Sequence, residues 1–463
     1  MFEGKKCLVV GSGISGIAAV RLLEELGAKV TIYDSNESLS EEELKKKLPE
    51  ESSAICVTGA VEKLGLEDDG KIREAFDYLV LSPGVPTDLS WINRVREARV
   101  PILGEIELGF LQEKGKVAAI TGTNGKTTTT TLVGDIMKAW LSPEKVFVVG
   151  NIGNPYTLEA LKTAEDTVTV GEISSFQLET VHTFRPKVSA ILNITPDHLN
   201  RHHTMEAYAA AKEAICKVQT KEERCVLNYS DPYLRPFGEN ECPATVVWFS
   251  SKEELSEGFF LRGDKICKAE GGQVTELLDI HKDMNLVGMC NVENVMAAIA
   301  IAEGMGAPME VILQVIASFH AVEHRIEYVA EKGGVVYYND SKGTNPDAAI
   351  QGIRAMDRPT VLIGGGYDKQ NEYDEWIESF GDKVKALVLI GQTREKIAEC
   401  ARKHGFEKIY FADTFEECLK LCTSLAKEGD AVLLSPACAS WGMFPNYEVR
   451  GKMFKEYVNS LKE

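Results

Sequence analysis

Two glycine-rich loops, each lying between a short apolar run and a helical pattern, most constrain the fold of this chain. The first loop, Gly11 to Gly16 (GSGISG), follows the apolar run KKCLVV and opens the stretch ISGIAAVRLLEELG. The second loop lies in ITGTNGKTTT (120–129), after the apolar run KVAAI and before TLVGDIMKAW. A glycine loop between a buried strand and a helix is typical of α/β folds with a parallel sheet. The sequence therefore predicts at least two α/β units.

The rest of the chain continues this alternation of apolar runs and helical patterns. Runs such as KVSAILNIT, RPTVLIGGG and AVLLSP read as buried strands, and GMCNVENVMAAIAIAEGMG reads as a helix. The stretch 90–116 resembles a helical connector, and 259–277 alternates like small antiparallel strands. We predict an α/β protein of three domains: an N-terminal Rossmann-like domain (1–93), a central P-loop domain with a mostly parallel sheet (94–302), and a C-terminal Rossmann-like domain (303–463).

Length and charge limit the class of protein. A chain of 463 residues is long enough for about three domains. Its 51 basic and 70 acidic side chains give a net charge of −19, which argues against a nucleic-acid partner. The 11 cysteines include no C-x-x-C pair and are predicted to be core residues of a reducing compartment. No signal peptide and no membrane span is expected, so we predict a cytoplasmic protein, and we expect a monomer.

The first loop has the context of a dinucleotide-binding site. Its glycines allow a tight turn and close approach of a diphosphate, which the following helix N-terminus attracts. Asp34, at the end of the next strand, can bind a ribose hydroxyl. NAD(P), FAD or any other diphosphate nucleotide fits these features. A glycine turn needed only for strand–helix packing is the remaining alternative.

The second loop is a shortened phosphate-binding loop. The general pattern G-x-x-x-x-G-K-[ST] requires a glycine five residues before Gly125, but Ile120 stands there. Successive backbone N–H groups in such a loop can still surround an anion. Lys126 can reach the β- and γ-phosphates, and Thr127 can bind Mg²⁺. A glycine-rich turn without a ligand is the alternative.

Segments along the whole chain resemble, in order, the Mur ligases and the related folylpolyglutamate synthases. They are GTNGKTTT, GNIG, EISSFQLE, NITPDHLNRH, AAAKEAI, CNVENVMAA, EHRIE, NDSKGTNP, GGGYDK and SPACASWGMFPNYEVRG. The segments EISSFQLE, NDSKGTNP and SPACASWGMFPNYEVRG are most similar to the branch that adds D-glutamate. The resemblance implies an ATP-dependent amide ligase that uses UDP-N-acetylmuramoyl-L-alanine and D-glutamate, through an acyl-phosphate intermediate, in peptidoglycan precursor synthesis.

By this resemblance the first glycine loop binds the uridine diphosphate of the substrate instead of a redox cofactor. Asn36 stands where relatives often carry a basic residue. The positions that match substrate contacts are Gly13, Ile14, Ser15, Gly16, Asp34, Ser35 and Asn151.

The resemblance also implies ATP and two Mg²⁺ sites. Cys290 stands where relatives often carry histidine. The positions that match ATP contacts are Gly122, Thr123, Asn124, Gly125, Lys126, Thr127, Thr128, Asn294, Arg325 and Asp340. Lys126, Glu172, His198 and Lys212 match catalytic residues. Mg²⁺ would be bound by Thr127, Glu172, His198 and Lys212, the last as a carbamate formed with CO₂.

Five further positions match contacts to D-glutamate in the relatives. A dianionic amino acid needs a cation and hydroxyl donors, which suits Lys369 and Ser440. Phe444 is expected in the core. The matching positions are Thr344, Lys369, Ser440, Trp441 and Tyr447.

Simpler interpretations of several of these residues remain open on the sequence alone. Lys212 and Lys369 can be solvated lysines, the first extending from a helix surface. Glu172 can form a salt bridge or lie beside a helix start. Ser174 and Ser175, which can assist near the substrate, can also cap a helix. DHLNRH lacks the glutamate of the zinc-protease motif, so His202 and His203 are expected at the surface or behind the site.

Three other functions share part of these sequence features. A folylpolyglutamate synthase shares the central loop but lacks a preceding UDP-binding domain of this kind. A sister ligase for L-alanine or a diamino acid is closer, although the DNPR-like segment of diaminopimelate ligases is absent from the sequence. An NAD-dependent oxidoreductase is favoured by residues 9–34 alone.

Overall fold

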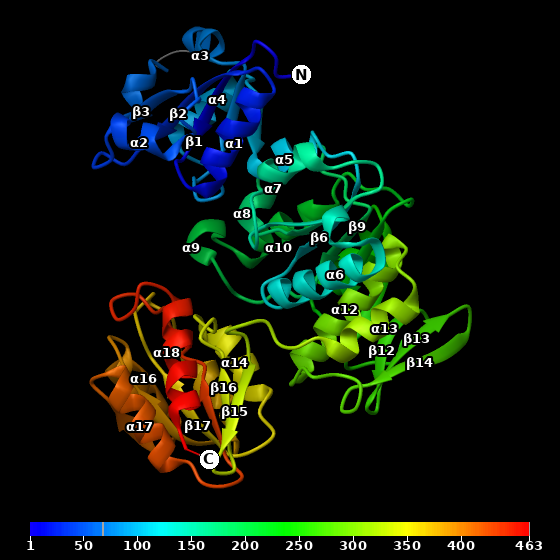
Figure 1. Ribbon diagram of the computed structural model, residues 1–463, viewed down its shortest axis with the longest axis vertical. Coiled ribbons are helices and arrows are strands. Elements are labelled where there is room, and N and C mark those ends of the chain that lie inside the picture. The colour runs from blue at the N-terminus through cyan, green and yellow to red at the C-terminus, as the bar shows by residue number, and fades with distance from the viewer. Residues whose placement is uncertain (67–68, 463) are drawn as a thin grey trace. The chain divides into compact units, whose positions relative to one another are not determined.

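The computed structural model describes residues 1–66 and 69–462 and has the predicted α/β character (Figure 1). Three sheets carry the chain, and helices alternate with most of their strands. The chain forms two compact units, the first made of Met1–Leu261, Cys267–Glu276 and Met296–Val315, the second of Arg262–Ile266, Leu277–Val295 and Ile316–Glu463.

The first sheet is fully parallel and has the strand order β3-β2-β1-β4-β5. This order reverses between β1 and β4, and such a reversal opens a crevice at the carboxyl ends of the strands. The strands are β1 (Lys6–Val10), β2 (Lys29–Asp34), β3 (Ile55–Thr58), β4 (Tyr78–Leu81) and β5 (Ile102–Gly104), and the helices are α1 (Ile14–Glu25), α2 (Glu41–Lys47), α3 (Asp69–Ala75) and α4 (Ser90–Glu97).

Alternate side chains of β1 enter two different cores. Cys7 and Val9 pack in one apolar cluster with residues of α1, while Leu8 and Val10 pack in another with residues of α4. A strand presents successive side chains to opposite faces, so a strand that is apolar throughout requires cover on both faces. The continuous run in KKCLVV therefore predicts helices on both sides of this sheet.

The central sheet has nine strands in the order β14-β13-β12-β11-β10-β9-β6-β8-β7. Strands β6 to β12 pair in parallel, and two-residue turns join β12, β13 and β14 as in hairpins. The strands are β6 (Lys116–Thr121), β7 (Val146–Gly150), β8 (Val168–Glu172), β9 (Val188–Ile191), β10 (Arg224–Asn228), β11 (Thr245–Ser250), β12 (Gly258–Arg262), β13 (Lys265–Glu270) and β14 (Gln273–Asp279).

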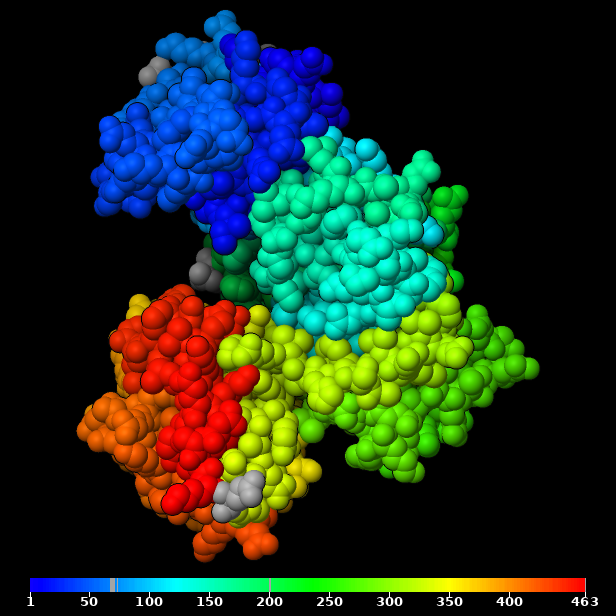
Figure 2. Space-filling view, viewed as in Figure 1, coloured from blue at the N-terminus to red at the C-terminus, as the bar shows by residue number. Residues whose placement is uncertain are grey.

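Helices of this central region include the one that follows the second glycine loop. Helix α1 of the first sheet packs against α5 and α7 (Figure 2). The helices are α5 (Glu105–Phe110), α6 (Lys126–Leu141), α7 (Tyr156–Glu159), α8 (Ser175–Leu178), α9 (Leu199–His202), α10 (Met205–Glu213), α11 (Leu234–Asn240), α12 (Met289–Met305) and α13 (Met309–Ser318).

The third sheet, in the second unit, has the order β15-β16-β20-β17-β18-β19 and is parallel except for β15. Apolar clusters cover both of its faces. Its elements are β15 (Glu327–Lys332), β16 (Val335–Asn339), α14 (Pro346–Arg354), β17 (Thr360–Gly364), α15 (Asp374–Glu378), β18 (Val384–Leu389), α16 (Arg394–Lys403), β19 (Ile409–Phe411), α17 (Phe415–Leu425), β20 (Ala431–Leu434) and α18 (Tyr447–Ser460).

The prediction of a wholly helical connector over 90–116 is wrong. The segment holds α4 and α5, but β5 between them pairs with β4 of the first sheet. The apolar pair Ile102–Leu103 is too short to register as a strand without its partner. The predicted boundaries after residues 93 and 302 fall inside α4 and α12, so the exact division of the chain stays a prediction. Across the described residues, every helix is too short or too polar to cross a bilayer.

Candidate active site

A cavity of about 840 Å³ in the first unit extends from the first glycine loop to Lys126, the residue that follows the second glycine loop. Its lining comes from the carboxyl ends of strands in the first two sheets, where ligands of open α/β sheets bind. The predicted residues that line it are Gly13, Ile14, Ser15, Asp34, Ser35, Lys126, Asn151, Ser174, Ser175, His198 and Lys212.

The first glycine loop has no room for side chains at its crossing with α1. Gly11 has φ +95, in the left-handed region that favours glycine. A Cβ on Gly16 would lie 1.8 Å from the Gly11 carbonyl oxygen, whereas a Cβ on Gly13 would meet nothing within 4 Å. Ile14 is 78% exposed at the cavity wall. The loop therefore offers backbone N–H groups and one apolar side chain to a ligand.

Asp34 is held in place by the loop beside it. Its Oδ2 accepts hydrogen bonds from the backbone N–H of Ser12 (2.9 Å) and from the Ser12 hydroxyl (2.5 Å), and its Oδ1 accepts one from the Asn36 N–H (3.0 Å). Burial opposes ionisation, but these hydrogen bonds and the nearby Lys47 leave the pKa of Asp34 below its ordinary value. The carboxylate is therefore ionised at neutral pH. Ser12, between two glycines, was not predicted as a site residue.

The second glycine loop is held by Asn193, which follows β9. The Thr123 N–H donates to the Asn193 carbonyl oxygen (2.9 Å), and the Asn124 N–H donates to Asn193 Oδ1 (2.8 Å). Gly122 and Gly125 have φ of +150 and +83. Lys126 Nζ donates to the carbonyl oxygens of Gly122 and Thr123, each at 2.8 Å. The loop thus keeps a fixed shape at the start of α6. Asn193 opens the segment NITPDHLNRH of the family resemblance, which was the available signal, but it was not predicted as a site residue.

Lys212 is buried, so its interpretation as a lysine extending into solvent is wrong. Its side chain is 1% exposed, and Nζ donates to the Gly122 carbonyl oxygen at 2.8 Å. Nζ also lies 4.6 Å from the centre of the Tyr208 ring. Burial, and then the positive charge of Lys126, lower the pKa of Lys212 well below its ordinary value. The structure thus brings two lysine amines to one carbonyl of the glycine loop.

Glu172, at the end of β8, is a buried carboxylate in which only one of the two oxygens has a hydrogen-bond partner. Its Oε1 accepts a hydrogen bond from Asn151 Nδ2 at 2.7 Å, while Oε2 is buried with no partner in the described part of the chain. A buried carboxylate oxygen without a donor is costly unless a ligand or cation completes it. Thr127, on the adjacent strand–loop–helix unit, is also buried. Among the described residues, these oxygen groups fit a hard cation such as Mg²⁺.

The histidines after β9 take different positions. His198 lines the cavity with φ +54, and its Nε2 lies 3.5 Å from Asp197 Oδ2. His202 is buried and its Nε2 lies 3.0 Å from the Ser175 hydroxyl, so the surface interpretation of His202 is wrong and the position behind the site is correct. His203 is exposed, as predicted. Ser174 caps α8 in a capping box with Gln177.

Arg201 was missed in the sequence and links the two parts of the cavity wall. Its guanidinium binds both carboxylate oxygens of Glu179 (3.1 and 2.7 Å) and donates to the carbonyl oxygens of Pro83 and Val85, each at 3.1 Å. It also lies over the Phe176 ring at 4.2 Å. The segment SPGVP after β4 thereby joins the helix that follows His198. Proline and glycine after a parallel strand were the available signal for this loop.

In the second unit, the loops after β17 and β20 bring three predicted D-glutamate residues together. The Tyr367 N–H donates to the Ala439 carbonyl oxygen at 2.9 Å, which joins the loops. Lys369 Nζ lies 5.0 Å from the centre of the Trp441 ring, and Ser440 is buried. Thr344 follows β16 and Tyr447 begins α18. Lys369 is exposed at the loop surface, and Phe444 is buried in the core as predicted.

The predicted ATP residues of the second unit surround a strained segment. His324 and Ile326 have φ of +67 and +46, which is unfavourable for a β-branched residue such as Ile326. Arg325 lies between them. The Ile326 N–H donates to Asp340 Oδ1 at 3.3 Å, and the Ser435 hydroxyl donates to Asp340 Oδ2 at 2.6 Å. Such strain is stored at functional sites when surrounding contacts fix it.

Asp340, Arg450 and Asn294 are each held by burial or by hydrogen bonds in this unit. Burial raises the pKa of Asp340 to about 7. Arg450 is 1% exposed and its guanidinium donates to the Ser341 hydroxyl (3.0 Å), the Ser341 carbonyl (2.7 Å) and the Cys438 carbonyl (3.2 Å). Asn294 Nδ2 donates to Asn291 Oδ1 at 3.1 Å, and Cys290 is half-buried. Arg450 lies in the segment SPACASWGMFPNYEVRG of the family resemblance, but it was not predicted as a site residue, because nothing local marks an arginine in a helix as buried.

Family models match three successive parts of the chain. Residues 5–104 match the Mur ligase MurD-like N-terminal domain, residues 120–302 the Mur ligase middle domain, and residues 324–438 the Mur ligase glutamate ligase domain.

Full-length relatives and solved structures extend the comparison. The chain is 54% identical to the UDP-N-acetylmuramoylalanine–D-glutamate ligase of Lachnoclostridium phytofermentans, over 100% of this chain and 99% of that protein. It is 44% identical to the enzyme of that name from Clostridioides difficile, over 99% of each. The fold is similar to that of the MurC ligase of Thermotoga maritima, with a TM-score of 0.60 and 19% identity, over 98% of this chain and 99% of that one. It is also similar to that of MurF of the same organism in complex with ADP, with a TM-score of 0.57 and 18% identity, over 99% of this chain and 96% of that one.

Proposed function

This chain belongs to the Mur ligase family, and from that premise we propose that it is an ATP-dependent ligase that joins D-glutamate to UDP-N-acetylmuramoyl-L-alanine. The products are the amide, ADP and phosphate. The observation that carries the proposal is one cavity lined by both the first glycine loop and the two lysines, Lys126 and Lys212, whose amines donate to the Gly122 carbonyl oxygen of the second loop. The full-length similarity to relatives that carry this enzyme name supports the choice of D-glutamate.

The first glycine loop would hold the uridine diphosphate of the substrate. Backbone N–H groups at the start of α1 attract the diphosphate, and the ionised Asp34 can accept a hydrogen bond from a ribose hydroxyl or the uracil. The exposed Ile14 offers an apolar surface to the base. The Ser12 hydrogen bonds keep Asp34 oriented toward the cavity. Asn36 donates its backbone N–H to Asp34, and Lys47 is the cation near this carboxylate.

The second glycine loop would hold the phosphates of ATP. Lys126 would exchange its hydrogen bonds to loop carbonyls for the β- and γ-phosphates. Gly122 to Thr128 supply the backbone donors and hydroxyls of this cradle. From the second unit, Asn294, Arg325 and Asp340 would contribute ATP contacts. We infer a monomeric cytoplasmic enzyme, consistent with a site built from one chain.

Two Mg²⁺ ions would be held by Thr127, Glu172, His198 and Lys212. The unpartnered Glu172 Oε2 and the buried Thr127 support this assignment. When bound, Mg²⁺ offsets the negative charge of the phosphates and of the substrate carboxylate. The lowered pKa of Lys212 favours the neutral amine, which is the form that reacts with CO₂ to give a carbamate. That reaction replaces a cation by a carboxylate next to the loop.

The reaction divides into two transfers. A carboxylate oxygen of the L-alanyl group attacks the γ-phosphorus of ATP, the bond to the ADP oxygen breaks, and an acyl phosphate forms. The amine of D-glutamate then attacks the acyl carbon, a tetrahedral intermediate forms and loses a proton, and phosphate leaves. Lys126 would reduce the repulsion between two anions in the first transfer. Asn151 would orient Glu172, and His198 lies at the cavity where the acyl group must pass.

D-Glutamate would bind to the loops after β17 and β20 in the second unit. The Lys369 ammonium can pair with a carboxylate, and the hydroxyls of Ser440 and Thr344 can donate to the same anion. Lys369 is positioned by the Trp441 ring. Trp441 and Tyr447 would limit the space for the side chain of the amino acid.

The proposal is tested by phosphate release with UDP-N-acetylmuramoyl-L-alanine and ATP fixed and the amino acid varied. We expect release with D-glutamate and a rate lower by at least about 100-fold with L-glutamate, L-alanine or meso-diaminopimelate, because a site built for one set of polar groups leaves them unpaired otherwise. NAD should have no effect. Release that depends on another amino acid but not on D-glutamate would contradict the assignment.

A further inference from the structure

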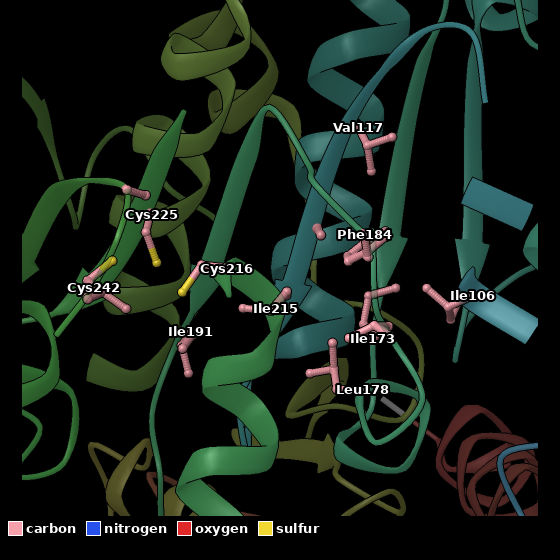
Figure 3. Packing of buried hydrophobic residues seen from close by; sticks show 14 of the residues in the cluster. Ile106, Val117, Ile173, Leu178, Phe184, Ile191, Ile215, Cys216, Cys225 and Cys242 are labelled. Carbon is pink, nitrogen blue, oxygen red and sulfur yellow. The ribbon is translucent and has the colours of Figure 1, made fainter. Parts of the chain in front are cut away.

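Three buried cysteines of the first unit lie side by side, away from the cavity described above. Cys216 ends the short 3₁₀ helix Ala214–Cys216, Cys225 lies in β10, and Cys242 follows α11. The three Sγ atoms lie within 4.8 Å of one another, and Figure 3 shows them facing each other. The side chains are 0%, 0% and 7% exposed. Three separate elements therefore direct their thiols to one point.

The surroundings of this three-cysteine cluster are mainly apolar, with Lys221 at its edge, where Nζ donates to the Cys242 carbonyl oxygen at 3.2 Å. The same hydrophobic core contains Ile191, Ile215, Leu227 and Phe237. Within the described residues, no histidine or carboxylate completes the group at this spacing. Structural zinc sites use four protein ligands, and Mg²⁺ or Ca²⁺ prefer oxygen. Three sulfur ligands without a fourth select a soft centre that accepts threefold coordination.

The net charge of the occupied site limits which ions the three thiolates can hold. A charge buried in an apolar core is costly unless it is neutralised. Three thiolates around a divalent ion keep a net charge of −1, and around a monovalent ion −2. Three thiolates around a trivalent centre give a neutral complex. A trivalent centre with a lone pair binds three sulfurs as a pyramid, so bonds of about 2.3 Å place the sulfurs about 3.5 Å apart, inside the 4.8 Å within which the three Sγ atoms lie.

We propose that Cys216, Cys225 and Cys242 form a binding site for one trivalent thiophilic centre, of the chemical class represented by arsenic(III). Arsenous acid reacts with three thiols so that three arsenic–sulfur bonds form and three arsenic–oxygen bonds break. Each thiol proton leaves with one hydroxide as water, and arsenic stays trivalent, so no oxidant or reductant is required.

Cys242 is the entry point of the site. It is the most exposed of the three and lies in the loop after α11. The neighbouring Cys216 and Cys225 side chains lower the pKa of Cys242 below its ordinary value. The thiolate is the attacking form of cysteine, so Cys242 reacts first and the other two sulfurs follow. The Cys216 thiol itself donates to the Glu213 carbonyl oxygen at 3.3 Å.

The cluster is connected to the proposed active site through one helical segment. Cys216 lies four residues after Lys212, and α10 leads directly into the 3₁₀ helix that Cys216 ends. Occupation of the cluster would fix the end of this segment. If the proposed ligase function holds, ligase turnover falls on binding, but binding itself is measured without any turnover.

The test is titration of the reduced full-length chain with arsenite, with arsenic per chain measured after gel filtration and thermal unfolding measured in parallel. We expect one tightly bound arsenic per chain and a rise in Tm on binding. Cys242→Ser should weaken binding by more than about tenfold. Cys225→Ala is a second variant that should weaken binding in the same way, so the test does not depend on the folding of one variant.

Two controls separate this site from other thiols. Cys267→Ser removes a buried cysteine of another cluster, and Cys422→Ser removes one member of the pair Cys418–Cys422 on α17. Both variants should bind arsenite as the parent chain does. Unchanged affinity in a folded Cys242→Ser chain, loss of affinity in a folded Cys422→Ser chain, or tighter binding of Zn²⁺ than of arsenite would overturn the proposal.

Discussion

Two lysine amines donate to the same carbonyl oxygen, that of Gly122, and their environments give them different roles. Lys126 lies at the start of α6, while Lys212 reaches the loop from α10 and is 1% exposed. Burial lowers the pKa of Lys212 and so favours its neutral amine. Lys126, at the start of α6, is placed to meet phosphates, and Lys212 is suited to chemistry that begins from the amine.

Substitution of Lys212 tests this difference. We expect Lys212→Ala to lower phosphate release by on the order of 100- to 1000-fold, the size of effect seen when one charge-stabilising group is lost. Millimolar formate or acetate should restore part of the rate, because a free carboxylate can occupy the place of the carbamate. Lys217→Ala, at an exposed position beyond the same helix, is the control and should remain active. Full activity of Lys212→Ala would exclude the role.

Asp340 gives a pH-dependent contribution to stability. Its pKa in the folded chain is about 7, above the 3.8 of an ordinary aspartate, mainly because of burial. The folded state therefore holds more protons between pH 4 and 7, and stability falls as the pH rises through this window. Asp340→Asn should remove this pH dependence. At pH 8 the free energy of unfolding of the two chains should differ by at most about 4 kcal/mol because of it. Urea unfolding of both chains from pH 5 to 8 measures it. Parallel pH profiles would show that Asp340 ionises normally.

At the scale of elements, the first glycine loop and α1 form one packed unit. The contact between Gly16 and the Gly11 carbonyl requires that position 16 carries no side chain, since a Cβ there would lie 1.8 Å from the oxygen. We expect Gly16→Ala to lower Tm by several degrees, equivalent to about 1–3 kcal/mol. Gly13→Ala, where a Cβ meets nothing within 4 Å, should change Tm little. Equal Tm values for the two variants would contradict the packing account.

Arg201 is the link between the loop after β4 and the helix α9. Arg201 and Glu179 are 16% and 15% exposed, so loss of one partner leaves a poorly solvated charge. We expect Arg201→Ala to raise KM for UDP-N-acetylmuramoyl-L-alanine by about tenfold or more, and Arg201→Lys to recover part of it. KM for ATP should change less.

The exposed pair Arg21–Glu25, whose side chains are 59% and 49% exposed, supplies a matched control, because a solvated ion pair contributes little. Arg21→Ala should leave both KM values near those of the parent chain. An Arg201→Ala enzyme with unchanged KM for the UDP substrate would mean that this link does not position the substrate loop.

At the scale of the whole molecule, the sequence predicts features that are encoded locally. Apolar runs and glycine loops correctly predict β1, β6 and the helices after them, because strand periodicity and turn chemistry are short-range properties of the sequence. The burial of Lys212 could not be predicted, because it depends on a glycine loop 90 positions earlier in the chain. Asn193 and Arg201 lie in the segment NITPDHLNRH of the family resemblance, but their roles were missed for the same reason: their partners come from distant parts of the chain.

The account assigns one glycine loop to the substrate and the other to ATP, and one measurement tests this most directly. Binding of UDP-N-acetylmuramoyl-L-alanine to Lys126→Ala is measured by calorimetry, together with its ATP turnover. We predict that turnover falls by at least about 100-fold, because the cation at the γ-phosphate is lost. Kd for the UDP substrate should stay within about threefold of the parent value. Equal loss of substrate binding and ATP turnover would contradict the assignment of separate roles to the two loops.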